Sequence, residues 1–252
     1  MVIYGLVLAG DPSWSSIALL GFLAALLAMD DTALAQTWFG QPLVAGILAG
    51  LFCGDAVTGV AIALPLQLLL IGNLPVGQTF TGEHSSAVVA AVGATVLAGH
   101  HLLPISGPLN WNSAALLGWM ILATGLLGAV GHWIIQAERR AHVLWMQEGH
   151  RTLRDGDLNR VEALHGRCLS ATLLRGFVLG ILYLLVLIRF WLPMFNVLPE
   201  PALQALGVLP FLIAGLGLGA LIEQYGIRAC WSWVTGGAVC GALLLWLAGG
   251  AG

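Results

Sequence analysis

Charged residues are scarce in this chain, and lysine is absent. Only 8% of its 252 residues are charged, whereas soluble domains carry about 25%. Hydrophobic residues make up 59% of the chain, mean hydropathy is +0.92, and no charged residue occurs from His84 to Ala137. A membrane-spanning helix needs roughly 20 mostly apolar residues, so this interval has room for two. The composition excludes a soluble globular protein and predicts an all-α, polytopic helical membrane protein.

Paired cysteines and catalytic motifs are missing as well. Cys53, Cys168, Cys230 and Cys240 form no CxxC pair, which argues against a disulfide framework or a metal site. The sequence contains no phosphate-binding loop, dinucleotide fingerprint or hydrolase motif. We therefore expect no catalytic residue, no metal and no cofactor. His165 is interpreted as a solvated loop histidine rather than a phosphoacceptor.

Most of the arginines fall in one charged segment, residues 136–175, within a single membrane domain of residues 1–252. The positive-inside rule places this segment in the cytoplasm. Acidic residues are interspersed there, which argues against a nucleic-acid partner and favours a solvated segment over an anionic-lipid patch. We expect it to be helical, with a turn at Asp155-Gly156-Asp157. Its arginines are Arg139, Arg140, Arg151, Arg154, Arg160, Arg167 and Arg175.

Polar side chains, glycines and prolines interrupt the apolar sequence between Gln41 and Gly77. In hydrocarbon, broken helices persist only where protein or a wet cavity surrounds them. Polar groups at that depth are costly and typically line a substrate path. We therefore expect interrupted or re-entrant helices over Gln41–Gly59 and Thr58–Gly72, which is typical of a transporter rather than an anchor. The remaining apolar runs predict helices near Ser15–Ala28, Ala87–Leu103, Ser113–Ile135, Gly176–Leu192, Leu206–Ile222 and Ala229–Ala248.

Four polar residues around the predicted helix break are candidates for binding a hydroxylated ligand: Gln67, Asn73, Gln78 and Glu83. Glu83 is an isolated carboxylate between long apolar stretches, so it needs a partner, water or a proton. The alternative for Glu83 is a solvent-facing position in an interfacial loop. The alternative for Gln67 is a structural hydrogen bond between helices.

Two acidic positions precede predicted helices. Asp55 is expected to cap a helix that begins at Val57. Asp30 and Asp31 suit an interfacial cap as well as a binding site, and we include Asp31 among the candidate substrate-binding residues.

Three blocks in this region carry a family resemblance: Gln-Pro-Leu-Val-Ala-Gly at residues 41–46, Gly-Leu-Phe-Cys-Gly-Asp-Ala-Val-Thr-Gly at 50–59, and Leu-Gln-Leu-Leu-Leu-Ile-Gly at 66–72. They resemble the enzyme IIC subunit of the mannose–fructose–sorbose family of the bacterial phosphotransferase system. The turn at Gly156-Asp157-Leu158, together with His165 and Arg175, looks like the central cytoplasmic region of that family. The resemblance extends from about Ala24 to Gly237.

The resemblance implies a multi-pass sugar permease subunit of the bacterial cytoplasmic membrane. Such a subunit pairs with a membrane IID subunit, works with cytoplasmic IIA and IIB proteins, and forms an oligomer. IIB phosphorylates the sugar as it crosses, and IIC carries no phosphorylation site, so the activity is that of a transport subunit within a phosphotransferase complex. The resemblance also implies sugar contacts at Gln67, Asn73 and Glu83.

The chain departs from this pattern at several points. Relatives often carry an acidic residue at the position of Gln67 and an amide near Pro75, and they often continue through a further span beyond Gly252. These departures leave open a second hypothesis, a non-transporting regulatory or scaffold subunit that docks phosphotransferase partners through the arginine-rich segment. An intramembrane enzyme is a third hypothesis, but no nucleophile–base pair or metal set is visible at membrane depth.

Overall fold

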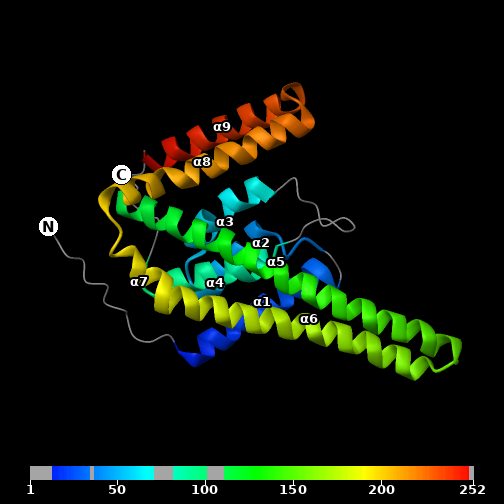
Figure 1. Cartoon of the computed structure of the whole chain (residues 1–252). Coiled ribbons are helices and arrows are strands. Elements are labelled where there is room, and N and C mark those ends of the chain that lie inside the picture. The colour runs from blue at the N-terminus through cyan, green and yellow to red at the C-terminus, as the bar shows by residue number, and fades with distance from the viewer. Residues whose placement is uncertain (1–12, 35–36, 71–81, 101–110, 250–252) are drawn as a thin grey trace.

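The chain folds into helices around a short central helix (Figure 1). The structure is a computed structural model that describes residues 13–34, 37–70, 82–100 and 111–249, and no strand occurs in these ranges. The all-α prediction is confirmed. The helices are α1 (Trp14–Thr32), α2 (Pro42–Cys53), α3 (Ala56–Leu70), α4 (His84–Leu97), α5 (Trp111–Arg154), α6 (Leu158–Val186), the π-helical turn η1 (Leu187–Trp191), α7 (Leu192–Phe195), α8 (Glu200–Tyr225) and α9 (Ile227–Gly249).

Three of the apolar helices are too short to cross a membrane. Helices α2, α3 and α4 have 12, 15 and 14 residues, or about 18, 22 and 21 Å at 1.5 Å per residue. The hydrocarbon core is about 30 Å thick. The expected interruption is thus confirmed within Gln41–Gly59, where α2 ends at Cys53 and α3 begins at Ala56, whereas the break expected after Thr58–Gly72 lies outside the described residues. The expected helix at Ala87–Leu103 is wrong in its bounds, because α4 begins earlier and ends at Leu97.

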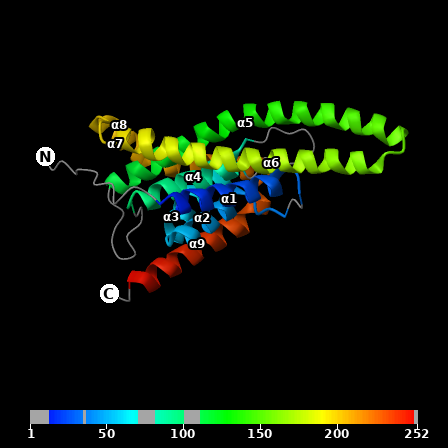
Figure 2. The ribbon, with the colours of Figure 1, turned by 90° about the horizontal axis from the view of Figure 1, so that it is seen from below.

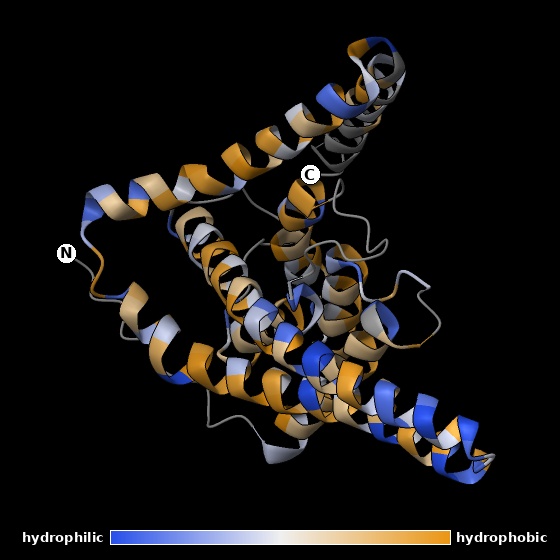
Figure 3. Ribbon diagram, turned by 45° about the vertical axis from the view of Figure 1, so that its right-hand side comes forward, coloured by the Kyte–Doolittle hydropathy of each residue, from blue (hydrophilic) through white to orange (hydrophobic). Residues whose placement is uncertain are grey.

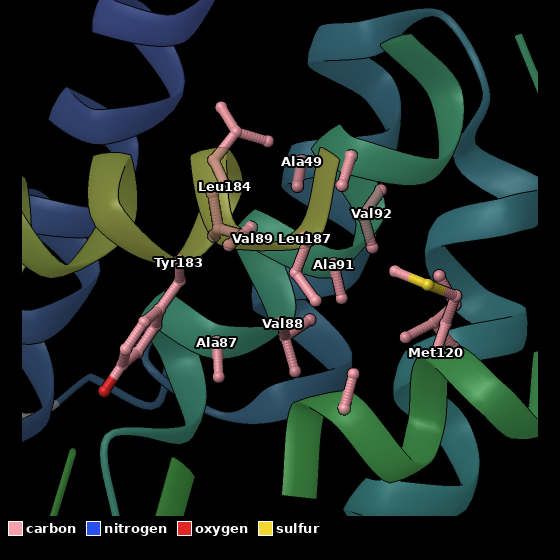
Figure 4. Close-up of a cluster of buried hydrophobic side chains, with 14 of the residues drawn as sticks. Ala49, Ala87, Val88, Val89, Ala91, Val92, Met120, Tyr183, Leu184 and Leu187 are labelled. Carbon is pink, nitrogen blue, oxygen red and sulfur yellow. The ribbon is translucent and has the colours of Figure 1, made fainter. Parts of the chain in front are cut away.

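Helix α4 lies at the centre of the fold, in contact with α1, α2, α5 and α6. Every residue from Ser85 to Thr95 is buried, so the helix is apolar on all sides, as a helix surrounded by protein must be. Figure 4 shows Val89, Ala91 and Val92 of α4 among Leu184 and Leu187, with Met120 of α5 on another side. The largest buried cluster therefore forms around α4 rather than between the long helices.

Close helix packing explains the glycine-rich sequence of α2 and α3. A Cβ atom at Gly59 would overlap the Gly46 carbonyl, and one at Gly46 would overlap the Ala63 side chain. Small residues let membrane helices approach to backbone contact in this way. Gly54, with φ of +83°, ends α2 in the left-handed conformation that favours glycine. The two helices therefore form a tight hairpin.

Within the described part of the chain, four helices are long and apolar enough to span a membrane: α1, α5, α6 with its continuation to Phe195, and α8. The chain is therefore a multi-pass membrane protein. The span expected near Ser113–Ile135 and the helix expected beyond Gln136 are both confirmed. They form one unbroken helix, α5, of 44 residues and about 66 Å.

The extension of α5 pairs with the first half of α6 to form a hairpin that projects beyond the other helices (Figures 1 and 2). We call this hairpin, residues 136–175, the arm. Figure 3 shows that its far end is coloured as hydrophilic, unlike the bundle. Gly156 has a φ of +79°, and the Asp157 side chain accepts a hydrogen bond from the Arg160 amide at 3.1 Å. The predicted turn at residues 155–157 is confirmed.

The π-helical turn after α6 is fixed by a pair of tryptophans. The rings of Trp119 and Trp191 stack with centroids 4.1 Å apart. Each indole N–H donates to the backbone carbonyl of the other residue, at 2.9 and 3.1 Å. A π-bulge is rare within an α-helix and needs support from its surroundings. The Trp119–Trp191 pair supplies this support by connecting η1 to α5 through two hydrogen bonds and ring stacking.

Candidate functional site

Glu83 directly precedes α4, and its side chain is only 1% exposed. Its backbone N–H donates to the Gly128 carbonyl of α5 at 3.2 Å, and its Oε1 accepts from the Ser86 hydroxyl at 2.7 Å. These contacts hold the carboxylate inside the protein. The alternative in which Glu83 faces solvent from a loop is therefore wrong.

Two glycines of α5 allow the start of α4 to lie this close. A Cβ atom at Gly131 would overlap the Glu83 Cβ and lie 2.9 Å from the Tyr183 hydroxyl. A Cβ atom at Gly128 would overlap the His84 ring. Because the two glycines are three residues apart, they lie on one face of α5. That face receives the first residues of α4.

Arg175 of α6 joins Glu83 to Glu138 of α5. Its Nε lies 3.4 Å from Glu83 Oε2, and its Nη1 lies 2.9 Å from Glu138 Oε2. Glu138 Oε1 accepts from the Thr172 hydroxyl at 2.6 Å. The three charged side chains are 5%, 1% and 12% exposed. Buried charges are tolerated when paired and hydrogen-bonded. Glu83, Glu138 and Arg175 form what we call the buried ion cluster, which links α4, α5 and α6.

The end of α1 brings two further carboxylates to this region. Asp31 is half-buried and interacts electrostatically with Glu83 and Arg175. Asp30 instead holds the loop before α2, where it accepts from the Thr37 amide, the Thr37 hydroxyl and the Gly40 amide at 2.8, 2.6 and 3.0 Å. Asp30 therefore has a structural role, whereas Asp31 interacts electrostatically with the ion cluster.

Gln67 forms the helix–helix hydrogen bonds of its alternative interpretation. Its Oε1 accepts from the Leu43 amide at 3.1 Å, and its Nε2 donates to Gln41 Oε1 at 3.2 Å. Leu43 lies in the first turn of α2, where backbone N–H groups have no partner within the helix. Gln67 thus ties the last turns of α3 to the start of α2.

The other expected residues divide into two groups. Asn73 and Gln78 lie outside the described residues. Asp55 caps α3, because its two carboxylate oxygens accept from the Thr58 amide at 2.9 Å and the Thr58 hydroxyl at 2.8 Å. The prediction that Asp55 is a structural cap is confirmed, with the helix beginning at Ala56.

A cavity of about 220 Å³ opens beside the buried ion cluster, at the base of the arm. The share of liquid volume per water is about 30 Å³, so the cavity has room for roughly seven waters or one small polar molecule. Guanidinium, imidazole, hydroxyl and carboxylate groups line it, so it suits a polar ligand. Its residues are Ala33, Ile135, Glu138, Arg139, His142, His165, Cys168, Leu169, Thr172 and Arg175.

A second cavity, of about 460 Å³, lies between the start of α5 and the first half of α8. Asn112, Glu200 and Gln204 supply its polar groups. Helix α5 runs from this cavity to the arm, so the two cavities lie toward opposite ends of that helix. Among the described residues, no three His, Cys, Asp or Glu side chains are grouped as a metal site.

The sequence did not indicate Glu138 or Arg175 as partners of Glu83. Both stand at the edge of an apolar run, Glu138 after the long uncharged interval and Arg175 before Gly176. Their position could have indicated a buried pairing, because a charged side chain at the edge of a membrane span lies close to the buried interior. The pairing itself joins residues 92 positions apart (175 − 83), and nothing local specifies it.

Two solved structures of membrane proteins have a fold similar to that of this chain. One, titled only as the structure of a membrane protein, has a TM-score of 0.70 and 20% sequence identity, and the match covers 94% of this chain and 96% of the other. The mannose transporter ManYZ, solved by cryo-electron microscopy in complex with microcin E492, has a TM-score of 0.55, with 20% identity and the same coverage. No curated protein matches the chain significantly.

The family model of the sorbose-specific IIC component of the phosphotransferase system matches residues 14–247. That range includes every described helix almost completely, together with the buried ion cluster and both cavities. Since the match covers most of the chain, this protein belongs to the family of sorbose-type IIC components, the membrane permease subunits of the sugar phosphotransferase system.

Proposed function

We propose that this chain binds a hexose-type sugar and moves it across the bacterial cytoplasmic membrane for phosphorylation by a partner IIB protein. The buried ion cluster carries the proposal. Ionisable groups inside a membrane domain are costly and usually mark a substrate or ion path, and here two carboxylates share one guanidinium at the start of a helix too short to span.

The proposed sugar-binding residues are Asp31, Gln67, Asn73, Gln78 and Glu83. Two of the described members support this choice, because Asp31 at the end of α1 interacts electrostatically with Glu83 before α4. The third, Gln67, is a partly buried amide beside the start of α2. A hydrogen bond to a charged group contributes about 1.5–3 kcal/mol. Two such bonds from sugar hydroxyls contribute about 3–6 kcal/mol, which spans the roughly 4 kcal/mol of millimolar affinity.

The cavity at the base of the arm supports a cytoplasmic route to this site. Glu138 and Arg175 belong both to its lining and to the buried ion cluster, so the cavity adjoins the proposed binding groups. The positive-inside rule places the arm in the cytoplasm. A sugar that leaves through this cavity would meet its phosphoryl donor on that side.

The proposal includes the partners of a phosphotransferase permease: a membrane IID subunit, cytoplasmic IIA and IIB proteins, and an oligomeric assembly. Membership of the IIC family supports these partners in general. The likeness of fold to a mannose transporter also supports them. The proposed chemistry stays with the soluble proteins, and this chain supplies sugar binding and translocation.

Uptake by proteoliposomes tests the proposal. Vesicles that contain this chain and its IID subunit should accumulate phosphorylated hexose when they enclose phosphorylated IIB. Glu83→Gln should reduce the rate at least tenfold, because a charged acceptor for sugar hydroxyls becomes a neutral amide. Glu162→Gln, which removes an exposed carboxylate of the arm, should leave the rate unchanged. The absence of uptake for every hexose tested would contradict the proposal.

A further inference from the structure

The α5 helix of the arm presents a continuous exposed stripe to solvent. Arg140, Leu144, Gln147, Arg151 and Arg154 are spaced by four, three, four and three residues, so they lie on one face. All five are exposed, and Leu144 is 65% exposed. Along the helix axis the stripe is about 21 Å long. We call it the α5 stripe.

The charge on this stripe is entirely positive. In the described part of the chain, Arg140, Arg151 and Arg154 form no ion pair, whereas arginines elsewhere on the arm have partners. Arg160, for example, lies 2.7 Å from Glu148. The acidic side chains of α5 are thus paired on the inner side of the arm, at Glu138 and Glu148. The three arginines of the α5 stripe, on the outer side of the arm, are therefore available to bind a partner molecule.

Distance along the helix argues against the membrane as the partner of Arg151 and Arg154. The apolar run of α5 ends near Ile135, and Arg151 and Arg154 lie about 24 and 28 Å further along the unbroken helix. Electrostatic attraction to a lipid surface decays over a Debye length of about 8–10 Å. With the axis of α5 along the membrane normal, the end of the stripe lies two to three Debye lengths beyond the end of the apolar run, whereas Arg140 lies within about one.

The apolar side chains within the stripe favour a protein over a nucleic acid. Leu144 and its neighbour Val143, which is 48% exposed, lie between Arg140 and the Arg151–Arg154 pair. An apolar centre with a polar rim is typical of protein interfaces. Nucleic-acid sites instead rely on contacts to phosphates and bases.

We propose that the α5 stripe docks a soluble partner protein through an acidic surface with an apolar centre. The identity of the partner rests on the proposed function, under which it is the phosphoryl donor, IIB. A single helix face about 21 Å long is small for a specific protein interface. Interfaces at the small end of the range are typically weak and transient. A short-lived complex suits a donor that must leave to be phosphorylated again.

Binding of purified IIB to this chain and its IID subunit in nanodiscs tests the proposal. The dissociation constant should rise about tenfold for Arg151→Gln/Arg154→Gln and remain near the wild-type value for Arg151→Lys/Arg154→Lys. Leu144→Ser should raise it several-fold without changing charge. Raising NaCl from about 50 to 500 mM should slow association of the wild type, as screening predicts.

A matched control separates the stripe from net charge. Asn159→Glu/Ala163→Glu changes the charge of the arm by the same two units but on exposed positions of α6, so IIB should bind it as it binds the wild type. Equal loss in the control, or unchanged binding of both Arg151→Gln/Arg154→Gln and Leu144→Ser, would overturn the proposal. Binding of the stripe to single-stranded RNA or to anionic phospholipid vesicles, with no binding of IIB, would overturn it too.

The outcome is distinguishable from failure of the proposed function. Sugar binding by the same nanodiscs, measured by calorimetry without IIB, depends on the buried site and not on the α5 stripe. Loss of IIB binding in the stripe variants with intact sugar binding supports docking. Wild-type nanodiscs that bind IIB but no hexose would contradict the sugar site and leave the docking surface standing.

Discussion

Removing Arg175 should destabilise the protein more than removing either carboxylate that it contacts. The side chains of Glu83 and Glu138 are 1% and 12% exposed, and Arg175→Met leaves both of them buried without their shared cation. Breaking a buried ion pair by deleting one partner typically costs about 3–5 kcal/mol. Glu83→Gln keeps the shape and the Ser86 contact, and it loses an interaction at 3.4 Å that is too long for a strong hydrogen bond.

The expected order of destabilisation therefore follows from the geometry. Arg175→Met should cost about 3–5 kcal/mol, Glu138→Gln about 1.5–3 kcal/mol because it weakens a charged contact at 2.9 Å, and Glu83→Gln about 1 kcal/mol or less. Adding Glu83→Gln to Arg175→Met should recover part of the loss, since it removes one of the two unpaired charges. The coupling expected between contacting groups is about 0.5–3 kcal/mol.

Unfolding in a mild detergent, followed by circular dichroism against denaturant, measures these differences. Arg167→Met is the matched control, because Arg167 lies on the same helix and stacks over Trp145 with its guanidinium carbon 4.6 Å from the ring centroid. An exposed cation–π contact contributes about 0.5–1 kcal/mol. If Arg175→Met is no more destabilising than Arg167→Met, the ion cluster does not have the energetic role described.

Three further substitutions test other parts of the fold. Gly131→Val should cost at least 1–3 kcal/mol, because its side chain overlaps Glu83, and thermal unfolding should show a lower midpoint. Trp191→Phe should cost about 1–2 kcal/mol, because it removes an indole hydrogen bond to the Trp119 carbonyl and weakens the stacked pair. Asp55→Ala should cost about 1 kcal/mol through loss of the α3 cap, and hydrogen exchange should increase at the first amides of that helix.

Each of these has its own control. Gly149→Ala, on the arm, should be neutral or stabilising, because the nearest atom to its new Cβ is 3.9 Å away. Trp133→Phe, at an exposed position, should change stability little. Asp55→Asn should retain most of the cap, since asparagine is also a strong N-cap residue. Equal effects in variant and control would refute the packing or capping role in question.

The sequence predicted the parts of the fold that depend on local chemistry. The glycine-rich segment before Gly59 predicted short, closely packed helices, and Asp55 and the turn at Asp155–Asp157 were recognised because caps and turns depend on neighbouring residues. The change in polarity near Gln136 divides the expected span from the expected helical segment, and nothing in that pattern shows that the two form one helix. No proline follows before Arg154, so nothing in the backbone chemistry ends the helix there.

The candidate site was predictable only in part. The isolation of Glu83 between apolar runs indicated a buried role, which the structure confirms. Its partner could not be identified, because the pairing with Arg175 depends on how α4 and α6 pack. Gln67 shows the opposite limit: an amide in an apolar helix suits a ligand contact and a helix–helix bond equally from sequence, and the structure shows the latter.

The uninterrupted course of α5 couples the tip of the arm mechanically to the core of the bundle. Trp119 and Met120 lie in the core of the bundle, and Arg154 lies more than 30 residues further along the same helix with no kink-forming proline between them. The segment of α5 from Ile135 to Arg154 is about 28 Å long, so tilting the helix axis by about 5° at Ile135 would displace the tip by roughly 2.4 Å. Any rearrangement that tilts α5 within the bundle would therefore appear as a larger movement at the hairpin tip.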